Sequence, residues 1–326
     1  MSSSLPLASI LLITYNQEKL VEESFRSLLA QTYPSIEIIV ADDFPKDKTR
    51  LIIEEIAKNY FGHIKIIFHD TKFNQGVCEN INQAIKLCQG EMIFIAAGDD
   101  ISLPTRCETV MTEWLKHDKK PGLIATDAFD MTLEGEILGT KKTSIFQNYA
   151  SLKDWIEKPP YFFGSSHSWS SKFLKKFPPL NQNLSAEDHL MVFRAIISDG
   201  ALTISEPLVK HRRGGVTLKK YISLTEKIQK LKVGFPDKLT LLQQFLFDAQ
   251  DQAYLPLLKK HLAIDINECE LAISLFNAKG ISQKIIRCCK FDGTSIFFKL
   301  RLLTYTAFPG ILKPIFWLKK FLRKYQ

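Results

Sequence analysis

The sequence predicts an α/β protein with a mostly parallel central sheet flanked by helices, followed by a mainly helical C-terminal extension. Over the first hundred residues, short apolar runs rich in β-branched residues alternate with segments of helical periodicity, which is typical of consecutive β-α-β units. Two of these runs, residues 36–43 and 91–100, contain an aspartate pair at their end. Parallel α/β sheets bind ligands outside the carboxyl ends of their strands, so these acids indicate a negatively charged pocket.

Each element has its own signal. The first strand is expected over residues 7–13, and it leads into Thr14-Tyr15-Asn16. Asn16 is expected to cap the following helix, with Glu18 in the first turn. Pro34 ends that helix, because the residue before a proline is pushed out of the helical region. Further strands are expected within residues 36–43, 64–69 and 91–100, and further helices over residues 48–60 and 76–88.

Length and composition indicate a folded protein with one large domain and a smaller appendage. The chain has 326 residues, of which 45% are hydrophobic and 24% charged, and this balance argues against disorder. Its six cysteines show no CxxC pairing, so we expect reduced thiols and no zinc site. Neither a signal peptide nor an uncharged apolar stretch of about 18 residues is evident, so no membrane span is expected.

The net charge of +8 is concentrated in the tail. Residues 293–326 hold seven Lys and Arg residues and no acid, which leaves +1 for the rest of the chain. A nucleic-acid groove would spread positive charge over a folded face, so no nucleic-acid partner is expected. A basic tail with large apolar residues instead indicates an anionic lipid surface.

A helix from Ile311 to Lys324 would be amphipathic. One face would carry Ile311, Ile315, Leu318 and Leu322, flanked by Phe321, while Lys313, Lys320, Arg323 and Lys324 would gather opposite, with Lys319 at the boundary. This pattern favours contact with a membrane surface. The alternative is a terminal helix docked on the protein's own core.

An ordered set of motifs extends over residues 7–217. The motifs are Ile13-Thr14-Tyr15-Asn16, Gln31-Thr32-Tyr33-Pro34, Ile38-Ile39-Val40-Ala41-Asp42-Asp43, Asn74-Gln75-Gly76-Val77, Asn82, Gly90-Glu91, Gly98-Asp99-Asp100 and Glu187-Asp188. In order and spacing they resemble the family 2 glycosyltransferases, which have the Rossmann-like GT-A fold. The resemblance implies a catalytic domain over residues 1–217 and a helical extension over residues 218–326.

Asp99 and Asp100 occupy the position of the family's DxD-type motif. The resemblance implies that one or both hold a divalent cation, Mn²⁺ or Mg²⁺, and through it the diphosphate of the donor. Ala97 stands where the common form has another aspartate, which implies fewer protein ligands. A simple polar turn after a strand is the alternative.

The resemblance also implies a nucleotide site at the ends of the first two strands. Asp43 would accept a hydrogen bond from the base, expected to be uracil, with Asp42 as the alternative contact. The other residues implied to bind the donor are Tyr15 beside the base, Thr14, Asn16 and Glu18 along that edge, and Asn74 and Asn82 under the phosphates. Ile81 stands where many relatives carry a basic residue.

Asp188 is the implied general base, which would take the proton from the acceptor hydroxyl as that oxygen attacks the anomeric carbon. Ser185-x-x-Asp188 also fits a helix capping box. Residues 162–169 combine aromatic and hydroxyl side chains, so we expect an acceptor wall there, with a buried strand as the alternative. His211, within the basic segment 210–217, is a candidate phosphate or metal contact because Gly214 replaces a family histidine.

These features favour a metal-dependent, inverting glycosyltransferase that moves a sugar from a UDP-sugar to an acceptor hydroxyl. The tail points to a lipid-linked oligosaccharide acceptor in surface polysaccharide synthesis, and to a cytoplasmic protein held at the inner face of the cell membrane. A sugar nucleotidyltransferase is one alternative, although it needs an early glycine-rich loop and residues 1–35 contain no glycine. A non-catalytic nucleotide or polysaccharide-binding module is the other, since Ala97, Ile81 and Gly214 depart from the family pattern.

Overall fold

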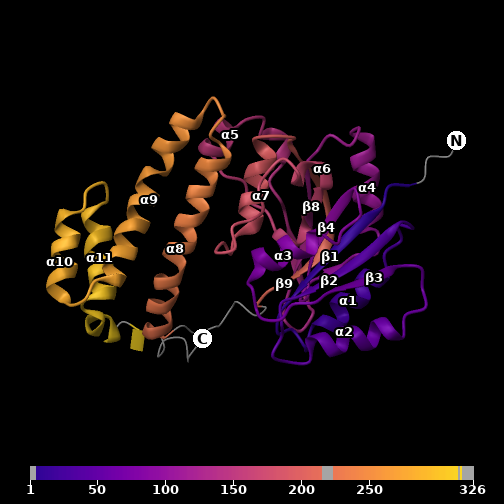
Figure 1. Cartoon of the computed structure of the whole chain (residues 1–326), viewed down its shortest axis with the longest axis horizontal. Helices are drawn as coiled ribbons and strands as arrows, with labels where there is room; N and C mark the ends of the chain where they lie inside the picture. Colours follow the sequence, from indigo (N-terminus) through magenta and orange to yellow (C-terminus); the bar gives the residue numbers. More distant parts are fainter. Residues whose placement is uncertain (1–4, 215–222, 315, 318–326) are drawn as a thin grey trace. The chain divides into compact units, whose positions relative to one another are not determined.

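The computed structural model describes residues 5–214, 223–314 and 316–317. Contacts between Cα atoms divide the chain into two compact units, Met1–Leu218 and Lys219–Gln326. The boundary predicted at residue 217 lies outside the described residues, and the roles assigned to the two segments stay predictions. Figure 1 shows the first unit with its sheet and the second unit as helices.

The alternation of strands and helices predicted for the first hundred residues is confirmed. The elements are β1 (Ala8–Thr14), α1 (Val21–Leu29), β2 (Ile36–Asp42), α2 (Thr49–Lys58), β3 (Lys65–His69), α3 (Val77–Ile85) and β4 (Met92–Ala97). The expectation that Asn16 caps α1 is wrong. Leu20 takes the N-cap position, and Asn16 has a φ of 53° because a turn intervenes between β1 and the helix.

The sheet is mixed, and its parallel part comes from the first four strands. The strand order is β3-β2-β1-β4-β8-β6-β9-β5, with β7 paired to β6. β3, β2, β1 and β4 run parallel (Figure 1). Beyond them, β8 joins β4 and β6 in antiparallel register, whereas β6 and β9 are parallel to each other. The α/β class is thus confirmed, while the predicted parallel character holds for one half of the sheet.

The remaining elements of the first unit extend the sheet and cover it. They are β5 (Ile101–Ser102), α4 (Arg106–Lys116), β6 (Leu123–Met131), β7 (Ile137–Lys141), α5 (Leu152–Glu157), β8 (Ser168–Ser170), α6 (Ser171–Leu174), α7 (Glu187–Ile196) and β9 (Ala201–Arg212). Short 3₁₀ turns occur at η1 (Phe146–Asn148) and η2 (Gly164–Ser166). The strand expected as an alternative over residues 162–169 is present only as β8.

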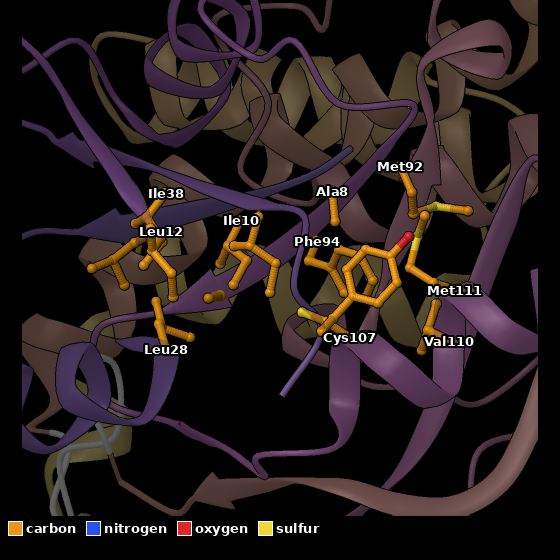
Figure 2. Close-up of a cluster of buried hydrophobic side chains, with 14 of the residues drawn as sticks. Ala8, Ile10, Leu12, Leu28, Ile38, Met92, Phe94, Cys107, Val110 and Met111 are labelled. Carbon is orange, nitrogen blue, oxygen red and sulfur yellow. The ribbon is translucent and has the colours of Figure 1, made fainter. Parts of the chain in front are cut away.

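Alternate residues of three neighbouring strands build the core on one face of the sheet. Ile10 and Leu12 of β1, Ile38 of β2 and Phe94 of β4 point to one face, as the two-residue period of a strand requires. Figure 2 shows Leu28 of α1 beside Leu12, and Cys107, Val110 and Met111 of α4 near Phe94. The core therefore fixes the strand ends that carry the aspartate pairs.

The second unit is helical, as predicted. It consists of α8 (Leu224–Asp248), α9 (Leu255–Asn277), α10 (Ile281–Lys290), α11 (Ile296–Thr306) and the 3₁₀ helix η3 (Pro309–Leu312). Its core joins Leu271 and Leu275 of α9 with Cys288 of α10 and Phe298 of α11. Among the described residues, no helix is both long and apolar enough to cross a membrane.

The predicted tail helix is only partly described. Ile311 lies in the 3₁₀ helix η3 rather than in an α-helix, and its side chain is 66% exposed. Lys313 is also exposed. The other predicted face-forming residues, Ile315, Leu318, Lys319, Lys320, Phe321, Leu322, Arg323 and Lys324, lie outside the residues for which a side chain is described.

Candidate active site

A cavity of about 450 Å³ opens at the carboxyl ends of β1 and β4. The parallel register brings these ends level, since Ile13 pairs with Ala41 of β2 and with Ala97 of β4. The lining residues are Ile13, Thr14, Tyr15, Gln17, Asp43, Asn74, Gly76, Val77, Asn80, Ile95, Ala96, Ala97, Asp99, Gly164, Ser165 and Glu187. The predicted site residues Thr14, Tyr15, Asp43, Asn74 and Asp99 therefore meet around one cavity.

Two other predicted donor contacts, Asn16 and Glu18, are not among the residues that line the cavity, and both hydrogen-bond to a loop. The carboxamide oxygen of Asn16 accepts a hydrogen bond from the backbone N–H of Lys46 at 2.7 Å. A carboxylate oxygen of Glu18 accepts one from the backbone N–H of Lys48 at 3.2 Å. Both side chains therefore fix the loop between β2 and α2 against the end of β1.

Asn82 faces a different cavity. Its amide nitrogen donates to the carbonyl of Leu180 at 2.7 Å, and its amide oxygen accepts from the Leu180 N–H at 2.9 Å. It lines a separate cavity of about 200 Å³. Its amide group joins α3 to the Leu180 backbone, which differs from the expected position under the donor phosphates. Two residues earlier, Asn80 lines the cavity of about 450 Å³.

Asp42 and Asp43 follow one another but face different surroundings. Asp42 is buried and its Oδ1 accepts a hydrogen bond from the Thr14 hydroxyl at 2.7 Å. Burial raises the pKa of Asp42 to about 6, and the Thr14 hydrogen bond offsets part of that rise. Asp43 lines the cavity, and its two carboxylate oxygens accept from the backbone N–H groups of Gln75 and Gly76 at 2.7 and 2.8 Å. Asp43 thereby shapes the loop that precedes α3.

Asp99 and Asp100 form the turn after β4. Asp99 lines the cavity. Burial, and then the charge of Asp100, raise the pKa of Asp99 to about 6, while His211 and Arg212 lower it in part. Asp100 is buried, and its Oδ1 accepts from the backbone N–H of Arg212 at 2.8 Å. Two adjacent carboxylates in a buried setting carry negative charge that a cation would stabilise.

The donor set at this turn fits a hard divalent cation. Carboxylate oxygens are the ligands that Mg²⁺ and Mn²⁺ prefer. His211 lies close enough for its charge to act on Asp99, and its Nδ1 is 3.4 Å from Nζ of Lys141. Among the described residues, no three His, Cys, Asp or Glu side chains gather around one point. Ligands from outside the protein would have to complete the coordination.

A second wall of the cavity comes from residues 164–188. Gly164 and Ser165 line it together with Glu187, the first residue of α7. Asp188 comes next, and its Oδ2 lies 3.0 Å from the position of a Cβ atom built on Gly164. Its Oδ1 accepts from the His189 N–H at 2.8 Å. Ala186 occupies the N-cap position of α7, so this helix starts one residue later than the capping box with Ser185 requires.

Aromatic side chains lie beside this wall. The ring of Phe162 is 4.9 Å from that of His189 and 5.2 Å from that of His167. His167 is buried, and burial lowers its pKa to about 3, so the ring is neutral at physiological pH. The predicted acceptor wall thus divides into a part that lines the cavity and a buried part.

Sequence reasoning missed several lining residues. Gln17 and Asn80 line the cavity, but neither was assigned a role. Asn80 is fully buried, and its amide nitrogen donates to the carbonyl of Ala41 at 2.7 Å. A polar residue at a buried position of the amphipathic helix α3 is the signal that could have identified it.

Comparisons with known proteins agree with this geometry. The family model described as glycosyl transferase family 2 matches residues 9–149. An uncharacterised glycosyltransferase of Methanocaldococcus jannaschii is 30% identical over 210 residues, which are 64% of this chain and 71% of the relative. An uncharacterised glycosyltransferase of Rickettsia typhi is 26% identical over 328 residues and 97% of each chain.

Solved structures share the fold at low sequence identity. TarS of S. aureus has a TM-score of 0.58 at 16% identity over 94% of this chain, which spans about half (54%) of TarS. TarS 1–349 in complex with UDP-GlcNAc has a TM-score of 0.54 at 18% identity, covering 92% of this chain and 91% of that one. The mannosyltransferase PcManGT of Pyrobaculum calidifontis, in complex with GDP-Man and Mn²⁺, has a TM-score of 0.54 at 14% identity, covering 95% and 88%.

The motif order, the cavity at the strand ends and the relatives lead to one identification. The predicted family and fold are confirmed, and the two alternatives, a nucleotidyltransferase and a non-catalytic module, are set aside. This chain belongs to glycosyltransferase family 2, has the GT-A fold and is a glycosyltransferase.

Proposed function

We propose that the enzyme transfers a sugar from a UDP-sugar to an acceptor hydroxyl, with inversion at the anomeric carbon and with a divalent metal. One observation carries the proposal. A single cavity is lined by Tyr15, Asp43 and Asp99 at the strand ends and by Gly164, Ser165 and Glu187 on a second wall. Donor and acceptor need to meet with the reacting atoms between them, and two chemically different walls suit that requirement.

The donor half would hold the nucleotide. Tyr15 offers a ring for the base, and Asp43 offers carboxylate lone pairs beyond those that accept from Gln75 and Gly76. Asn74, whose amide nitrogen donates to the carbonyl of Asp43 at 3.0 Å, would fix the loop under the phosphates. TarS 1–349 was solved with UDP and with UDP-GlcNAc, which supports a UDP-sugar donor.

Asp99 would hold the cation, with Asp100 and His211 as further candidate ligands. When bound, the metal would neutralise the charge that develops on the departing diphosphate. The raised pKa of Asp99 supports this role. It means that the protein alone stabilises the charged carboxylate poorly, so a bound cation would stabilise it further. PcManGT was solved with Mn²⁺, which supports the choice of metal.

Asp188 would act as the general base. Its Oδ1 is engaged with the His189 N–H, and its Oδ2 lies on the side of Gly164, a lining residue. The acceptor hydroxyl would give its proton to Asp188 while its oxygen forms the new bond to the anomeric carbon, and the UDP oxygen would leave on the opposite face. That geometry inverts the anomeric configuration.

Asp188→Asn tests this assignment. Turnover should fall at least about a hundredfold, because a general base commonly contributes on this scale. UDP affinity should stay near that of the wild type, since Asp188 does not line the cavity on the donor side. Calorimetry of UDP binding beside an assay of sugar release from a panel of UDP-sugars, with and without Mn²⁺, measures both. Near-normal turnover in the variant would contradict the role of base.

The acceptor is proposed to be a lipid-linked oligosaccharide in surface polysaccharide synthesis, reached from the inner face of the cell membrane. Within the second unit, residues 224–277 carry six Lys and seven Asp or Glu, whereas residues 279–317 carry seven Lys or Arg and one acid, Asp292. The latter segment also exposes Phe297 (81%) and Trp317 (67%). Basic charge beside exposed aromatic residues suits an anionic lipid surface.

Deletion of residues 311–326 tests the membrane contact. The wild type should sediment with anionic liposomes, and binding should weaken without vanishing as salt rises, because only its electrostatic part is screened. The truncated protein should still bind UDP and should sediment less. Neutral liposomes are the control. Absence of binding by the wild type, together with a lower melting temperature after deletion, would show a docked structural helix instead.

A further inference from the structure

Arg212, the last residue of β9, connects this strand to three other parts of the first unit: the turn after β4, the backbone at Leu133 and helix α1. Its backbone N–H donates to Oδ1 of Asp100 at 2.8 Å. Its guanidinium donates through Nε to the carbonyl of Asp99 at 2.9 Å, through Nη1 to the carbonyl of Leu133 at 2.7 Å, and through Nη2 to a carboxylate oxygen of Glu23 at 2.6 Å. The residue is 5% exposed.

These hydrogen bonds fix the turn after β4 at both of its acidic residues. One bond holds the carboxylate of Asp100, and another holds the backbone of Asp99. Because the Asp99 carbonyl and the Asp100 carboxylate are both held, the turn is constrained at two consecutive residues. Asp99 lines the cavity from this turn.

Only an arginine can make this set of contacts. A guanidinium directs several N–H groups in one plane, whereas a lysine ammonium is a single charged point on a flexible stem. The three guanidinium nitrogens of Arg212 each donate to a different protein group. The side chain is therefore engaged inside the fold. Arg213, the next residue, pairs instead with Asp130.

We propose that Arg212 is the positioning residue of the metal and diphosphate site, and that it acts by holding the Asp99-Asp100 turn rather than by touching the donor. This role rests on the proposed metal-dependent function. Glu23, which accepts from the outer end of the guanidinium, would support Arg212 from α1. Loss of the three guanidinium hydrogen bonds should therefore weaken the metal-dependent part of UDP binding and leave the metal-independent part unchanged.

Arg212→Lys is the test, because it keeps the positive charge and removes the planar guanidinium group with its several N–H donors. Calorimetry should show UDP affinity in saturating Mn²⁺ falling by at least about tenfold, with UDP affinity in EDTA within about twofold of the wild type. Glu23→Gln keeps the side-chain size and should cause a smaller loss in the same direction. Arg26→Lys is the matched control, since Arg26 lies on the same helix in an exposed pair with Glu22, and it should bind UDP as the wild type does.

A melting curve of each variant separates positioning from stability. If Arg212→Lys lowers the melting temperature but keeps the wild-type dependence of UDP affinity on Mn²⁺, the residue is structural and the proposal is overturned. If Arg212→Lys does not fold, Glu23→Gln decides, and an unchanged Mn²⁺ dependence in that variant overturns the proposal. If the wild type itself bound UDP equally well with and without Mn²⁺, the metal site would be refuted. That result needs no variant, so it is distinguished from a failure of the Arg212 proposal.

Discussion

The two aspartate pairs look alike in sequence but differ in the structure. At the end of β2, Asp42 is buried against Thr14, while the second residue, Asp43, lines the cavity. After β4 the order is reversed, because the first residue, Asp99, lines the cavity and Asp100 is held by Arg212. Each pair therefore gives one carboxylate to the cavity and one to the fold.

The alternation of side chains along extended backbone explains the division between Asp42 and Asp43 at the end of β2, since neighbouring residues of a strand point in opposite directions. Asp99 and Asp100 lie instead in the turn after β4. The reversal has a different origin. β2 continues to Asp42, whereas β4 stops at Ala97 and Gly98 begins a turn. A Cβ atom on Gly98 would lie 2.6 Å from Cγ2 of Thr14, so the turn passes close to the end of β1. Asp43 and Asp99 both lie two residues beyond the residue that pairs with Ile13, so the register of the strands decides which acid of a pair lines the cavity.

The largest effect is expected on metal-dependent UDP binding, and it should differ between substitutions of Asp99 and of Asp100. Asp99→Ala should abolish the metal-dependent part of UDP binding, a loss of about a hundredfold or more, because the cavity would lose its cation ligand. Asp100→Ala should weaken that binding too, but should also lower stability by about 1–3 kcal/mol, since the Arg212 N–H loses its buried acceptor. UDP titrations with and without Mn²⁺, beside urea denaturation, measure the two effects. Equal stability of the two variants would break the distinction.

Acidification should weaken metal-dependent UDP binding at a higher pH than an ordinary aspartate would allow. The pKa of Asp99 is raised from 3.8 to about 6, so the protonated form, which is a poor cation ligand, accumulates below pH 6. Affinity for the metal should fall about tenfold for each pH unit below that value. UDP titrations in EDTA over the same pH range correct for protonation of UDP. An affinity that is unchanged between pH 7 and pH 5 would contradict a cation ligand with a raised pKa at Asp99.

Asp42→Asn should stabilise the protein at neutral pH. Burial raises the folded-state pKa of Asp42 to about 6 from its ordinary value of 3.8, so the charged form destabilises the folded state above pH 6. That cost disappears below about pH 3.8, where the carboxyl is protonated in both states. The substitution should therefore add about 2 kcal/mol at pH 7 and almost nothing near pH 4. Urea denaturation at both pH values checks this sign, and destabilisation at pH 7 would contradict it.

Asp43→Asn should have the smallest effect on stability and the opposite sign. An asparagine keeps one acceptor oxygen, so one of the two hydrogen bonds from Gln75 and Gly76 is lost. The expected cost is about 1 kcal/mol, together with weaker UDP binding that is independent of Mn²⁺. Denaturation and titration in EDTA measure both. Stabilisation like that expected for Asp42→Asn would show that the two residues have equivalent surroundings.

Local patterns predicted the parallel half of the sheet well. The apolar runs that became β1, β2, β3 and β4 carry their signal within a few residues each, because both faces of these strands are buried. The other half, which mixes parallel and antiparallel pairs, was not predicted. Two of its strands are very short, since β8 has three residues and β5 has two. Such short strands exist only through their pairing with distant segments, and no short window of sequence contains that information.

The candidate site also has a part that was predicted from the sequence and a part that was not. The ends of the apolar runs correctly indicated where Tyr15, Asp43 and Asp99 would gather, because the carboxyl ends of parallel strands meet at one edge of the sheet. Asn16 and Asn82 were assigned to the donor, but their amides hydrogen-bond to backbone groups of Lys46 and Leu180. A polar residue near a strand end has several possible partners, and only tertiary contacts select one.

By itself, the sequence determined the α/β class, the order of the first seven elements and the family, because periodicity and ordered motifs are local properties of the chain. The tertiary structure decided which acid of each pair faces the cavity, and it brought Gly164, Ser165 and Glu187 to the cavity at the strand ends. It also joined Arg212 to Asp99, Asp100 and Glu23. These contacts join residues that are more than a hundred positions apart in the sequence. They therefore depend on the order in which the strands pair in the sheet and not on any local pattern.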